Sequence, residues 1–303
     1  MKRVGRVAVV LALVLGGCTA QAGTDGNLTN GWPAMPSAKP VVPVAGSCWA
    51  YRYGLPATAL ITARVNWSVV DCASGEHNLE TAYVGTFTGA DAASPAPPAD
   101  DSPAQRAAYA TCVEQVRAYL GGDWRLASVW LTLVQPAVGQ WRVGARWFRC
   151  DLGHLANSVE LIQVNTGSVR DGLRGARSLA ITCLTAEEIP NGTINLADAL
   201  DCAKPHQAEF VGIFIAPDGA YPAADNGAAL ADSGCIKAVG HFLGFADAAD
   251  WNNPTVGYWP GGFDKQRWGL GDRSERCYAY AYTKNKTFVG SVRGIGNSPA
   301  RSS

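Results

Sequence analysis

The chain carries few charged side chains, and the two signs balance. Charged residues make up 17% of its 303 residues, with 25 basic against 25 acidic side chains. Lys and Arg are scattered and form no basic cluster, so the attraction that dominates binding to nucleic-acid phosphates is missing. We therefore expect no nucleic-acid partner. Because hydrophobic residues make up 48% of the chain, we expect a folded protein with a sizeable core.

Several motifs of enzymes and cofactor sites are also missing. The sequence contains no G-x-x-x-x-G-K-[S/T] phosphate loop, no dinucleotide fingerprint, no HExxH and no C-x-x-C. Ser168 and Ser291 lie in Gly-Ser-Val-Arg segments, and neither has the G-x-S-x-G or S-x-x-K frame of many serine nucleophiles. Our first expectation is therefore that the protein has no catalytic residue, no metal and no cofactor.

No stretch is long and apolar enough to cross a membrane, which takes about 20 residues in a helix. The apolar run "VAVVLALVL" follows a basic start, "MKRVGR", which is the pattern of a signal peptide. The next residues, "LGGC", resemble a bacterial lipobox, in which the cysteine, here Cys18, is lipidated. We expect cleavage before Cys18 and a lipid anchor that holds the exported chain on the outer face of the plasma membrane. The alternative is an ordinary secretory signal cleaved near "TAQA".

A ten-residue pattern, W-x-x-G-x-R-x-x-R-C, occurs twice, at 141–150 and at 268–277. Further matches keep the same order in both copies, with offsets between 123 and 130 positions. Ordered matches at a nearly constant offset indicate an internal repeat, and a period this long makes each copy a domain. We expect a signal peptide at 1–17, a lipidated cysteine and flexible tether at 18–43, a domain at 44–173, a linker at 174–182, a second domain at 183–296 and a tail at 297–303.

Eight cysteines remain after Cys18, and disulfides persist outside the cell. Each predicted domain holds four of them, which is enough for two bridges. Spacing alone does not decide the pairing. Our working expectation pairs the first cysteine of each domain with the fourth, and the second with the third. The eight cysteines are Cys48, Cys72, Cys112, Cys150, Cys183, Cys202, Cys235 and Cys277.

Strands dominate the predicted secondary structure, with one main helix in each copy. Short apolar runs rich in aromatic and β-branched residues predict strands. In the first copy, Ser102 as N-cap, a proline in the first turn and Gly121 at the end predict a helix over 103–120. The predicted class is α+β, with two tandem homologous domains, each a mostly antiparallel sheet with one main helix and two disulfides. The predicted strands include 63–72, 81–87, 128–134, 210–215 and 277–283.

The order of these motifs resembles the septum formation domain, which occurs in exported and membrane-anchored proteins of actinobacteria. The shared features are a Cys-x-x-Pro-His-x-x-Glu stretch, a helix that carries a cysteine, a Trp-x-x-Gly-x-Arg…Cys stretch and a closing Gly-Ser-[Val/Leu]-Arg. The first copy departs from this pattern, with Gly75-Glu76 before His77 where the family has proline. The resemblance implies a role in septation or envelope biology and implies no reaction. The second copy matches through Cys202, Pro205, His206, Glu209, Cys235, Pro260, Trp268, Gly271, Arg273, Cys277, Gly290 and Ser291.

The best candidate functional residues are two His-x-x-Glu pairs, His77/Glu80 and His206/Glu209. Such a pair can ligate a metal or act as a general base. Alternatively, each pair leads a turn into a strand, where His caps backbone groups and Glu pairs with an Arg. Residues three apart on an extended strand face opposite sides, so one metal could not bind both without a bend. We therefore favour a structural role or a contact with a partner.

The arginines of the repeated pattern are candidates for the same two roles. Arg146 and Arg273, with Arg149 and Arg276, could pair with the two glutamates or face an anionic wall polymer. We favour internal pairing with the glutamates. The tryptophans of the pattern are expected to fill a core near a cystine, and its glycines to allow a turn.

Together these features predict a non-enzymatic lipoprotein that binds or organises other components at the cell envelope or division septum. Its partners would be the membrane, through the lipid, and envelope or division proteins or the cell wall. Two alternatives remain at this point. One is a metal-dependent envelope hydrolase built on the His-x-x-Glu pairs. The other is a module that binds cell-wall glycans through exposed tryptophans such as Trp49, Trp124, Trp251 and Trp259.

Overall fold

The computed structural model of the protein describes residues 39–50, 55–56, 68–155, 161–188, 194–281 and 286–302. The predicted signal peptide, Cys18 and most of the predicted tether lie outside these residues. The first part of the strand predicted at 63–72 also lies outside them. Within the described residues, no helix combines the length and the hydrophobicity that a membrane span requires.

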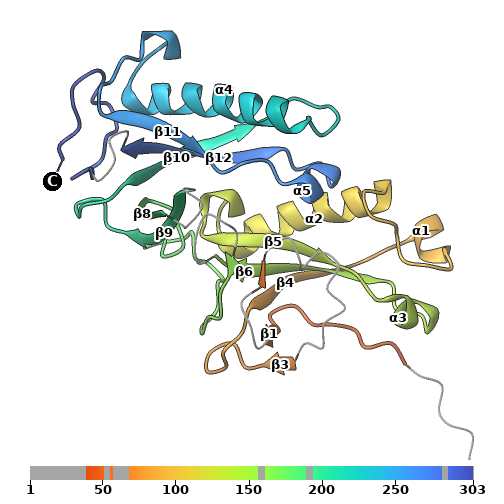
Figure 1. The fold of residues 1–303 in the computed structure, drawn as a ribbon. Coiled ribbons are helices and arrows are strands. Elements are labelled where there is room, and N and C mark those ends of the chain that lie inside the picture. The colour runs from red at the N-terminus through yellow and green to blue at the C-terminus, as the bar shows by residue number, and fades with distance from the viewer. Residues whose placement is uncertain are drawn as a thin grey trace, which may run out of the picture. The chain divides into compact units, whose positions relative to one another are not determined.

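Two antiparallel sheets of five strands each form the framework of residues 39–303 (Figure 1). We refer to residues 39–173 as the first half and to residues 183–302 as the second half. The first half contains β1 (Cys48–Ala50), β3 (Ser68–Val70), β4 (Leu79–Thr86), β5 (Val129–Val134) and β6 (Trp147–His154). The second half contains β8 (Cys183–Glu188), β9 (Ile194–Leu200), β10 (Ala208–Ile215), β11 (Val256–Pro260) and β12 (Ser274–Ala281). A separate pair joins β2 (Leu55–Pro56) to β7 (Leu161–Ile162).

The two sheets have the same strand order. The first runs β3-β1-β4-β6-β5, and the second, read from the matching edge, runs β9-β8-β10-β12-β11. Both sheets also have a register shift at the same place. It follows Thr81 in the pairing of β4 with β6, and Phe210 in the pairing of β10 with β12. The predicted α+β class with antiparallel sheets is therefore confirmed, and the shared order suggests the predicted tandem arrangement.

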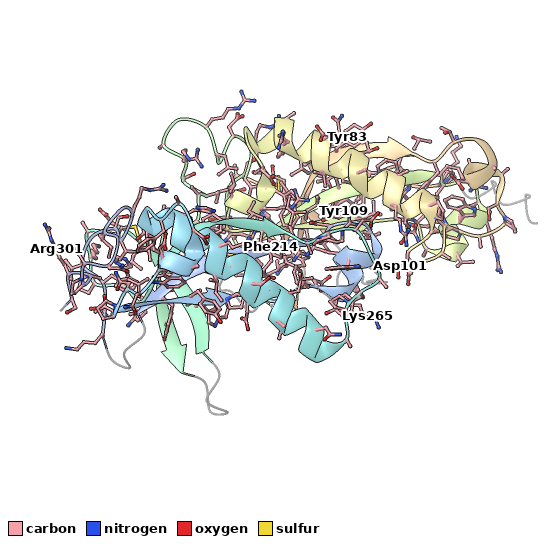
Figure 2. The ribbon with its side chains drawn as sticks, turned by 90° about the horizontal axis from the view of Figure 1, so that it is seen from above. Tyr83, Asp101, Tyr109, Phe214, Lys265 and Arg301 are labelled. Atoms are coloured by element: carbon pink, nitrogen blue, oxygen red, sulfur yellow. A yellow bond between two sulfur atoms is a disulfide. The ribbon has the colours of Figure 1, made fainter. Side chains whose placement is uncertain are left out.

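One long helix lies against each sheet (Figure 2). In the first half this is α2 (Pro103–Leu120), whose predicted N-cap is confirmed because Ser102 Oγ accepts a hydrogen bond of 3.3 Å from a first-turn amide. The helix ends at Gly121, whose φ of 83° lies in the left-handed region that glycine adopts without strain. In the second half, α4 (Ala224–Leu243) lies against β10, β11 and β12. The shorter elements are α1 (Gly89–Ala93), α3 (Val138–Arg142), α5 (Lys265–Gly269) and the 3₁₀ turns η2 (Trp124–Leu126) and η3 (Ala248–Asp250).

All eight predicted cysteines form disulfides, but the expected pairing is wrong. In each half the first cysteine pairs with the second, and the third with the fourth. The physical reason for the first bridge is strand register, because Cys48 in β1 lies opposite Val70 in β3 and Cys72 follows two residues later. The reason for the second is that α2 carries Cys112 over the sheet, above Cys150 in β6. The four disulfides are Cys48–Cys72, Cys112–Cys150, Cys183–Cys202 and Cys235–Cys277.

The repeated pattern builds a short helix, a tight turn and the strand that carries the last cysteine. Trp141 in α3 and Trp268 in α5 are both buried, which confirms their predicted place in the core. Gly144 and Gly271 follow with φ of 102° and 94°, so glycine is required for the turn. The first core also includes Leu270 from the second half, so the two halves share apolar contacts.

Candidate functional site

The carboxylate of Glu80 is bound by the Gly-Ser-Val-Arg segment that ends the first half. Glu80 lies in β4 and is 2% exposed. It accepts hydrogen bonds from Ser168 Oγ at 2.5 Å, from the Val169 amide at 2.7 Å and from Tyr119 Oη. Burial, together with the adjacent carboxylate, raises the pKa of Tyr119 to about 12, so the phenol keeps its proton and donates. These donors satisfy the buried charge inside the protein. We call this group the first carboxylate cluster.

The second half contains the equivalent arrangement, the second carboxylate cluster. Glu209 in β10 is 6% exposed and accepts hydrogen bonds from Ser291 Oγ at 2.5 Å and from the Val292 amide at 2.8 Å. Phe242 takes the position that Tyr119 has in the first half, so this cluster has no phenol donor. In both halves the arginine after the Ser-Val pair stacks on that aromatic ring, at 4.1 Å in the first half and 4.2 Å in the second.

The two histidines fasten the start of a central strand to the segment before Gly-Ser-Val-Arg. His77 and His206 are 3% and 0% exposed, and each Nδ1 bonds the carbonyl two residues earlier, at 2.9 and 2.7 Å. Their backbones pair with Asn165 and Phe288, respectively. The backbone-capping role predicted for His is therefore what the structure shows.

Potential metal-ligating atoms do come together beside Glu80. Atoms of Cys48, His77 and Glu80 lie within 4.8 Å of one another, because the chain bends between His77 and β4. The bend that a shared metal site would require is therefore present in the first half. The cysteine sulfur is bonded in a disulfide, however, and offers no thiolate. In the second half, the equivalent group consists of both cystine sulfurs and Glu209, without the histidine. These residues fit internal contacts better than a metal centre.

The expected pairing of arginines with Glu80 and Glu209 is wrong, because serine and amide donors occupy both carboxylates. Arg146 donates instead to the carbonyls of Ala92, Trp141 and Ala145, at distances of 2.5 to 2.8 Å. Its counterpart Arg273 forms an ion pair of 2.9 Å with Asp218 in the loop after β10. Both arginines therefore hold loops at the ends of their own sheets.

A family model described as "Septum formation" matches residues 54–277, which is well over half of the chain. The chain belongs to the septum formation family. The match is a single one that runs through both halves and ends at Cys277, before the segment that carries Ser291. No curated protein and no solved structure matches the chain significantly.

This septum formation protein also contains a buried charge cluster between the two halves, which the sequence analysis did not predict. Asp272 lies between Arg125 of η2 and Arg267 of α5, with N–O distances of 3.1 and 3.6 Å. Tyr109 of α2, labelled in Figure 2, donates to the same carboxylate at 3.0 Å. Burial alone would raise the pKa of Asp272, but the two arginines and hydrogen bonds from Ser274 outweigh it and hold that pKa below its usual value. An ionised carboxylate thus joins residues of both halves.

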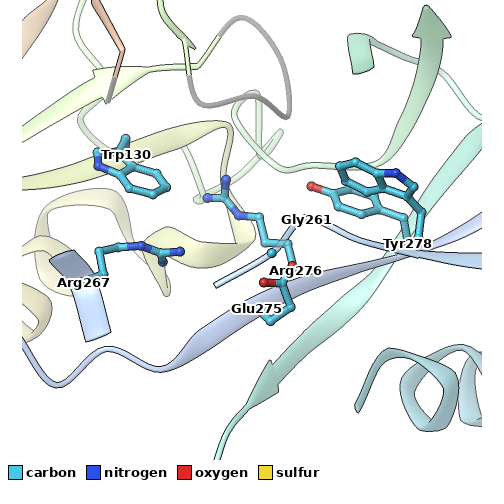
Figure 3. A pocket seen from close by; sticks show the side chains of 8 residues that line it. Trp130, Gly261, Arg267, Glu275, Arg276 and Tyr278 are labelled. Atoms are coloured by element: carbon cyan, nitrogen blue, oxygen red, sulfur yellow. The ribbon is translucent and has the colours of Figure 1, made fainter. Parts of the chain in front are cut away.

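A cavity of about 30 Å³ lies beside this cluster, with Trp130 of β5 on one side and Arg267, Arg276, Tyr278 and Glu275 of the second half on the others (Figure 3). Arg276 crosses to the first half and donates to three backbone carbonyls there, at 2.9 to 3.0 Å. Glu275 is 2% exposed, and burial raises its pKa to about 7 against the opposing effect of nearby backbone amides and arginines. The cavity thus contains a carboxyl group that titrates near neutrality.

The tryptophans considered for glycan binding lie in different surroundings. Trp124 is 1% exposed, and Trp49 donates to Thr81 at 2.8 Å. Trp259 is half-buried and lines the cavity between the halves. Trp251 is half-buried in a separate groove beside α4, where it packs edge-on against Tyr258. The four tryptophans therefore do not form one common platform.

We predict that Glu275→Gln stabilises the protein at neutral and alkaline pH. A raised carboxyl pKa means that the folded protein keeps a proton that the unfolded chain releases above about pH 4.5. The wild type therefore loses stability as pH rises from about 4.5 to about 7, by up to about 3 kcal/mol. In urea unfolding, the free energy of unfolding of the variant should exceed that of the wild type at pH 8 and equal it at pH 4. Glu114→Gln, at an exposed position of α2, should show no such difference, and an equal effect in both variants would contradict the assignment.

Proposed function

We propose that this septum formation protein is a lipoprotein on the outer face of an actinobacterial plasma membrane, where it binds envelope or division proteins without catalysing a reaction. The observation that carries the proposal is the burial of both His-x-x-Glu pairs. Each histidine and each glutamate is bonded within its own half and is at most 6% exposed. A general base must come within hydrogen-bond reach of the proton that it removes from a substrate, and these buried groups are bonded within the fold. The cysteines beside both glutamates are bonded in disulfides and offer no thiolate to a metal.

The disulfides and the family support an exported protein. Four disulfides in one chain are typical of proteins that fold in an oxidising compartment. The lipobox-like sequence ending at Cys18 supports anchoring by lipid, and the residues up to 43 would serve as a flexible tether. Such an anchor keeps the folded part close to the membrane, where division and wall-synthesis proteins work.

We also infer that the two halves arose by tandem duplication. The inference rests on the shared strand order, the equivalent disulfides and the two carboxylate clusters built from the same motif. Duplicated halves offer two related outer surfaces, which raises the strength of binding where one partner engages both.

The experiment that tests the proposal is imaging of a full-length fluorescent fusion in dividing cells. A matched Cys18→Ala form, carrying a competent secretory signal, removes the lipid and leaves the folded part unchanged. We expect the wild type in a band at the septum, and loss or blurring of that band without the lipid. An even coat over the whole membrane, unaffected by the division cycle, would contradict a role at the septum. If the septal band is seen, crosslinking there would identify the partner.

A further inference from the structure

The strand β11 forms one edge of the second sheet, and part of its backbone is open for pairing (Figure 1). The amide of Gly261, just past the strand, donates to a carbonyl of β12 at 3.3 Å. In an antiparallel pair every second residue bonds the neighbouring strand, so Val256, Tyr258 and Pro260 point their backbone groups away from β12. As this orientation requires, the Val256 amide donates to the side chain of Asn253. Within the described residues, no group outside the sheet bonds the backbone of Tyr258.

The matching edge of the first sheet is covered by the chain itself. There β5 has the place of β11, and each of its residues 129–133 is at most 2% exposed. Arg276 of the second half donates to the Val129 carbonyl of this strand at 3.0 Å. In β11, by contrast, only Val256 is buried, and residues 257–260 are half-buried. An uncovered sheet edge is a template for another extended segment.

An apolar groove of about 400 Å³ lies beside this edge, on the face of the sheet that α4 covers. Its larger side chains are Ile236 of α4, Trp251 directly after η3 and Tyr258 of β11. The rings of Trp251 and Tyr258 pack edge-on at 6.2 Å. A segment that pairs with β11 would direct every second side chain into this groove, because the side chains of a strand alternate between the two faces.

The flank of α4 that borders the groove carries a negative charge. Asp232 and Ile236 are one helical turn apart, so they lie on the same flank. Lys237 lies on the opposite flank, three positions after Gly234. A Cβ atom at Gly234 would lie 2.2 Å from the ring of Phe214, so that flank faces β10 instead. The charged side chain of this part of α4 that borders the groove is therefore the carboxylate of Asp232.

This carboxylate lies close to the groove and has no opposing charge. Burial and, after it, the negative charge of Asp232 raise the pKa of the Tyr258 phenol, which places the two side chains near each other. None of the ion pairs among the described residues includes Asp232, and none of the residues that line the groove is charged. A guest with a Lys or Arg beside its apolar side chains is complementary to this arrangement.

These features favour a segment of another protein over two other occupants. A second copy paired edge to edge would bring two Asp232 carboxylates to one groove, where they repel each other. The tether of the chain itself leaves from the first half, where Trp147 Nε1 donates to the Val41 carbonyl at 2.9 Å. The groove belongs to the second half.

We propose that β11 and this groove bind an extended segment of a partner protein, which adds a sixth strand to the second sheet. Its backbone pairs with the outward groups of Tyr258 and of the neighbouring β11 residues. Its alternate apolar side chains fill the groove, and a Lys or Arg pairs with Asp232. In such strand addition, main-chain hydrogen bonds give affinity and the side-chain sites give specificity. This inference rests on the proposed binding function and names its surface and the chemistry of its partner.

The first test selects segments from a display library of random eight-residue peptides on the full exported chain. On the wild type we expect enriched segments that alternate apolar residues and carry Lys or Arg at one end. Asp232→Lys should select Asp or Glu there instead, a change that a damaged fold would not produce. Glu114→Lys, the same charge change at an exposed position of α2, should select the wild-type segments. No enrichment on the wild type, or an unchanged charge preference in Asp232→Lys, would overturn the proposal.

Tyr258→Pro tests the backbone pairing. Proline removes the outward amide and leaves the bonds of Gly257 and Trp259 to β12 in place. The matched control is Tyr258→Ala, which removes the same side chain and keeps the amide. We expect the best selected peptide to bind Tyr258→Pro about five- to tenfold more weakly than Tyr258→Ala, since one hydrogen bond is lost. Equal affinities would contradict an added strand.

Hydrogen exchange of the wild type does not depend on any variant. In the free chain the Tyr258 amide should exchange rapidly at low and at high protein concentration, and the selected peptide should slow this exchange at saturation. Protection that grows with protein concentration, without peptide, would assign the edge to a second copy. Protection at every concentration would assign it to another part of this chain. Either result would overturn the proposal, as would a bound peptide that leaves the Tyr258 amide unprotected.

Peptide binding and septal localisation test different proposals. Selected peptides that bind as expected, without a septal band in cells, would uphold the groove and contradict the proposed place of action. A septal band without any selected peptide would uphold the proposed function and overturn the groove as its binding surface.

Discussion

Replacing Glu80 by alanine is expected to lower the free energy of unfolding by about 3–5 kcal/mol. The change removes the acceptor of three buried donors, the hydroxyl of Ser168, the phenol of Tyr119 and the amide of Val169. It also leaves a void in place of the Glu80 side chain, which is 2% exposed. Chemical unfolding of the exported part, with its disulfides intact, measures the loss.

The second half offers a matched comparison within the same chain. Glu209→Ala leaves two donors without an acceptor, whereas Glu80→Ala leaves three, because Phe242 stands where the first half has Tyr119. We therefore expect its loss to be smaller than that of Glu80→Ala by about 1 kcal/mol. Tyr119→Phe gives the first cluster the same donors as the second. We expect it to lower the free energy of unfolding by a similar amount, about 1 kcal/mol. Glu80→Gln keeps the volume and one acceptor, and should lose less than Glu80→Ala.

A different pattern of results would overturn the structural assignment of these glutamates. If Glu80→Ala unfolds at the same denaturant concentration as the wild type, the carboxylate is not what fixes the Gly-Ser-Val-Arg segment. If that variant also loses septal localisation or a bound metal while it stays folded, the results would favour a functional role for the His-x-x-Glu pair over a structural one.

Features with local causes could be predicted from the sequence. The helix α2 begins and ends where Ser102 and Gly121 place it, since caps act on the nearest turn of backbone. The buried tryptophans and glycine turns of the repeated pattern also follow from neighbouring residues. The repeated sequence pattern predicts a tandem arrangement, which the shared strand order of the two sheets suggests.

Features that depend on distant contacts could not be predicted. Ser168 lies 88 positions from Glu80, and Tyr109 lies 163 positions from Asp272. No spacing rule connects residues so far apart, and the closing serine carried only the weak signal of a repeated Gly-Ser-Val-Arg. The prediction of the cystine pairing was wrong for the same reason. The pairing depends on the register of β1 against β3 and on where α2 crosses its sheet.

Equivalent residues of the two halves also have different roles. In the first half Arg149 pairs with Asp151 at 2.7 Å and stacks on Trp49, all within that half. Its counterpart Arg276 donates to carbonyls of the first half, and the position of Asp151 is taken by Tyr278. A repeated sequence pattern therefore predicts a repeated backbone but not a repeated contact. The charge cluster around Asp272 is likewise a contact between the halves that the repeated pattern does not predict.

That cluster gives the second large effect, since we expect Asp272→Asn to cost about 3–5 kcal/mol at pH 7. The substitution keeps the size of the side chain but removes the charge between Arg125 and Arg267, which are 14% and 7% exposed. Two guanidinium groups would then stay buried with less opposing charge. Because those arginines belong to different halves, the loss should appear as weaker cohesion between the halves, measured by faster hydrogen exchange of the amides of η2 and β12.

The pH dependence of the same variant tests the cause. The pKa of Asp272 is lowered in the folded protein, so its carboxylate stabilises the fold above the ordinary aspartate pKa of about 4 and loses that contribution as pH falls. The difference between wild type and Asp272→Asn should therefore shrink below about pH 4. Asp218→Asn is the matched control, because Asp218 pairs with Arg273 at 2.9 Å but is 91% exposed. Such a surface pair is worth less than about 1 kcal/mol, so a similar loss in both variants would show that burial of the charge is not the source of the effect.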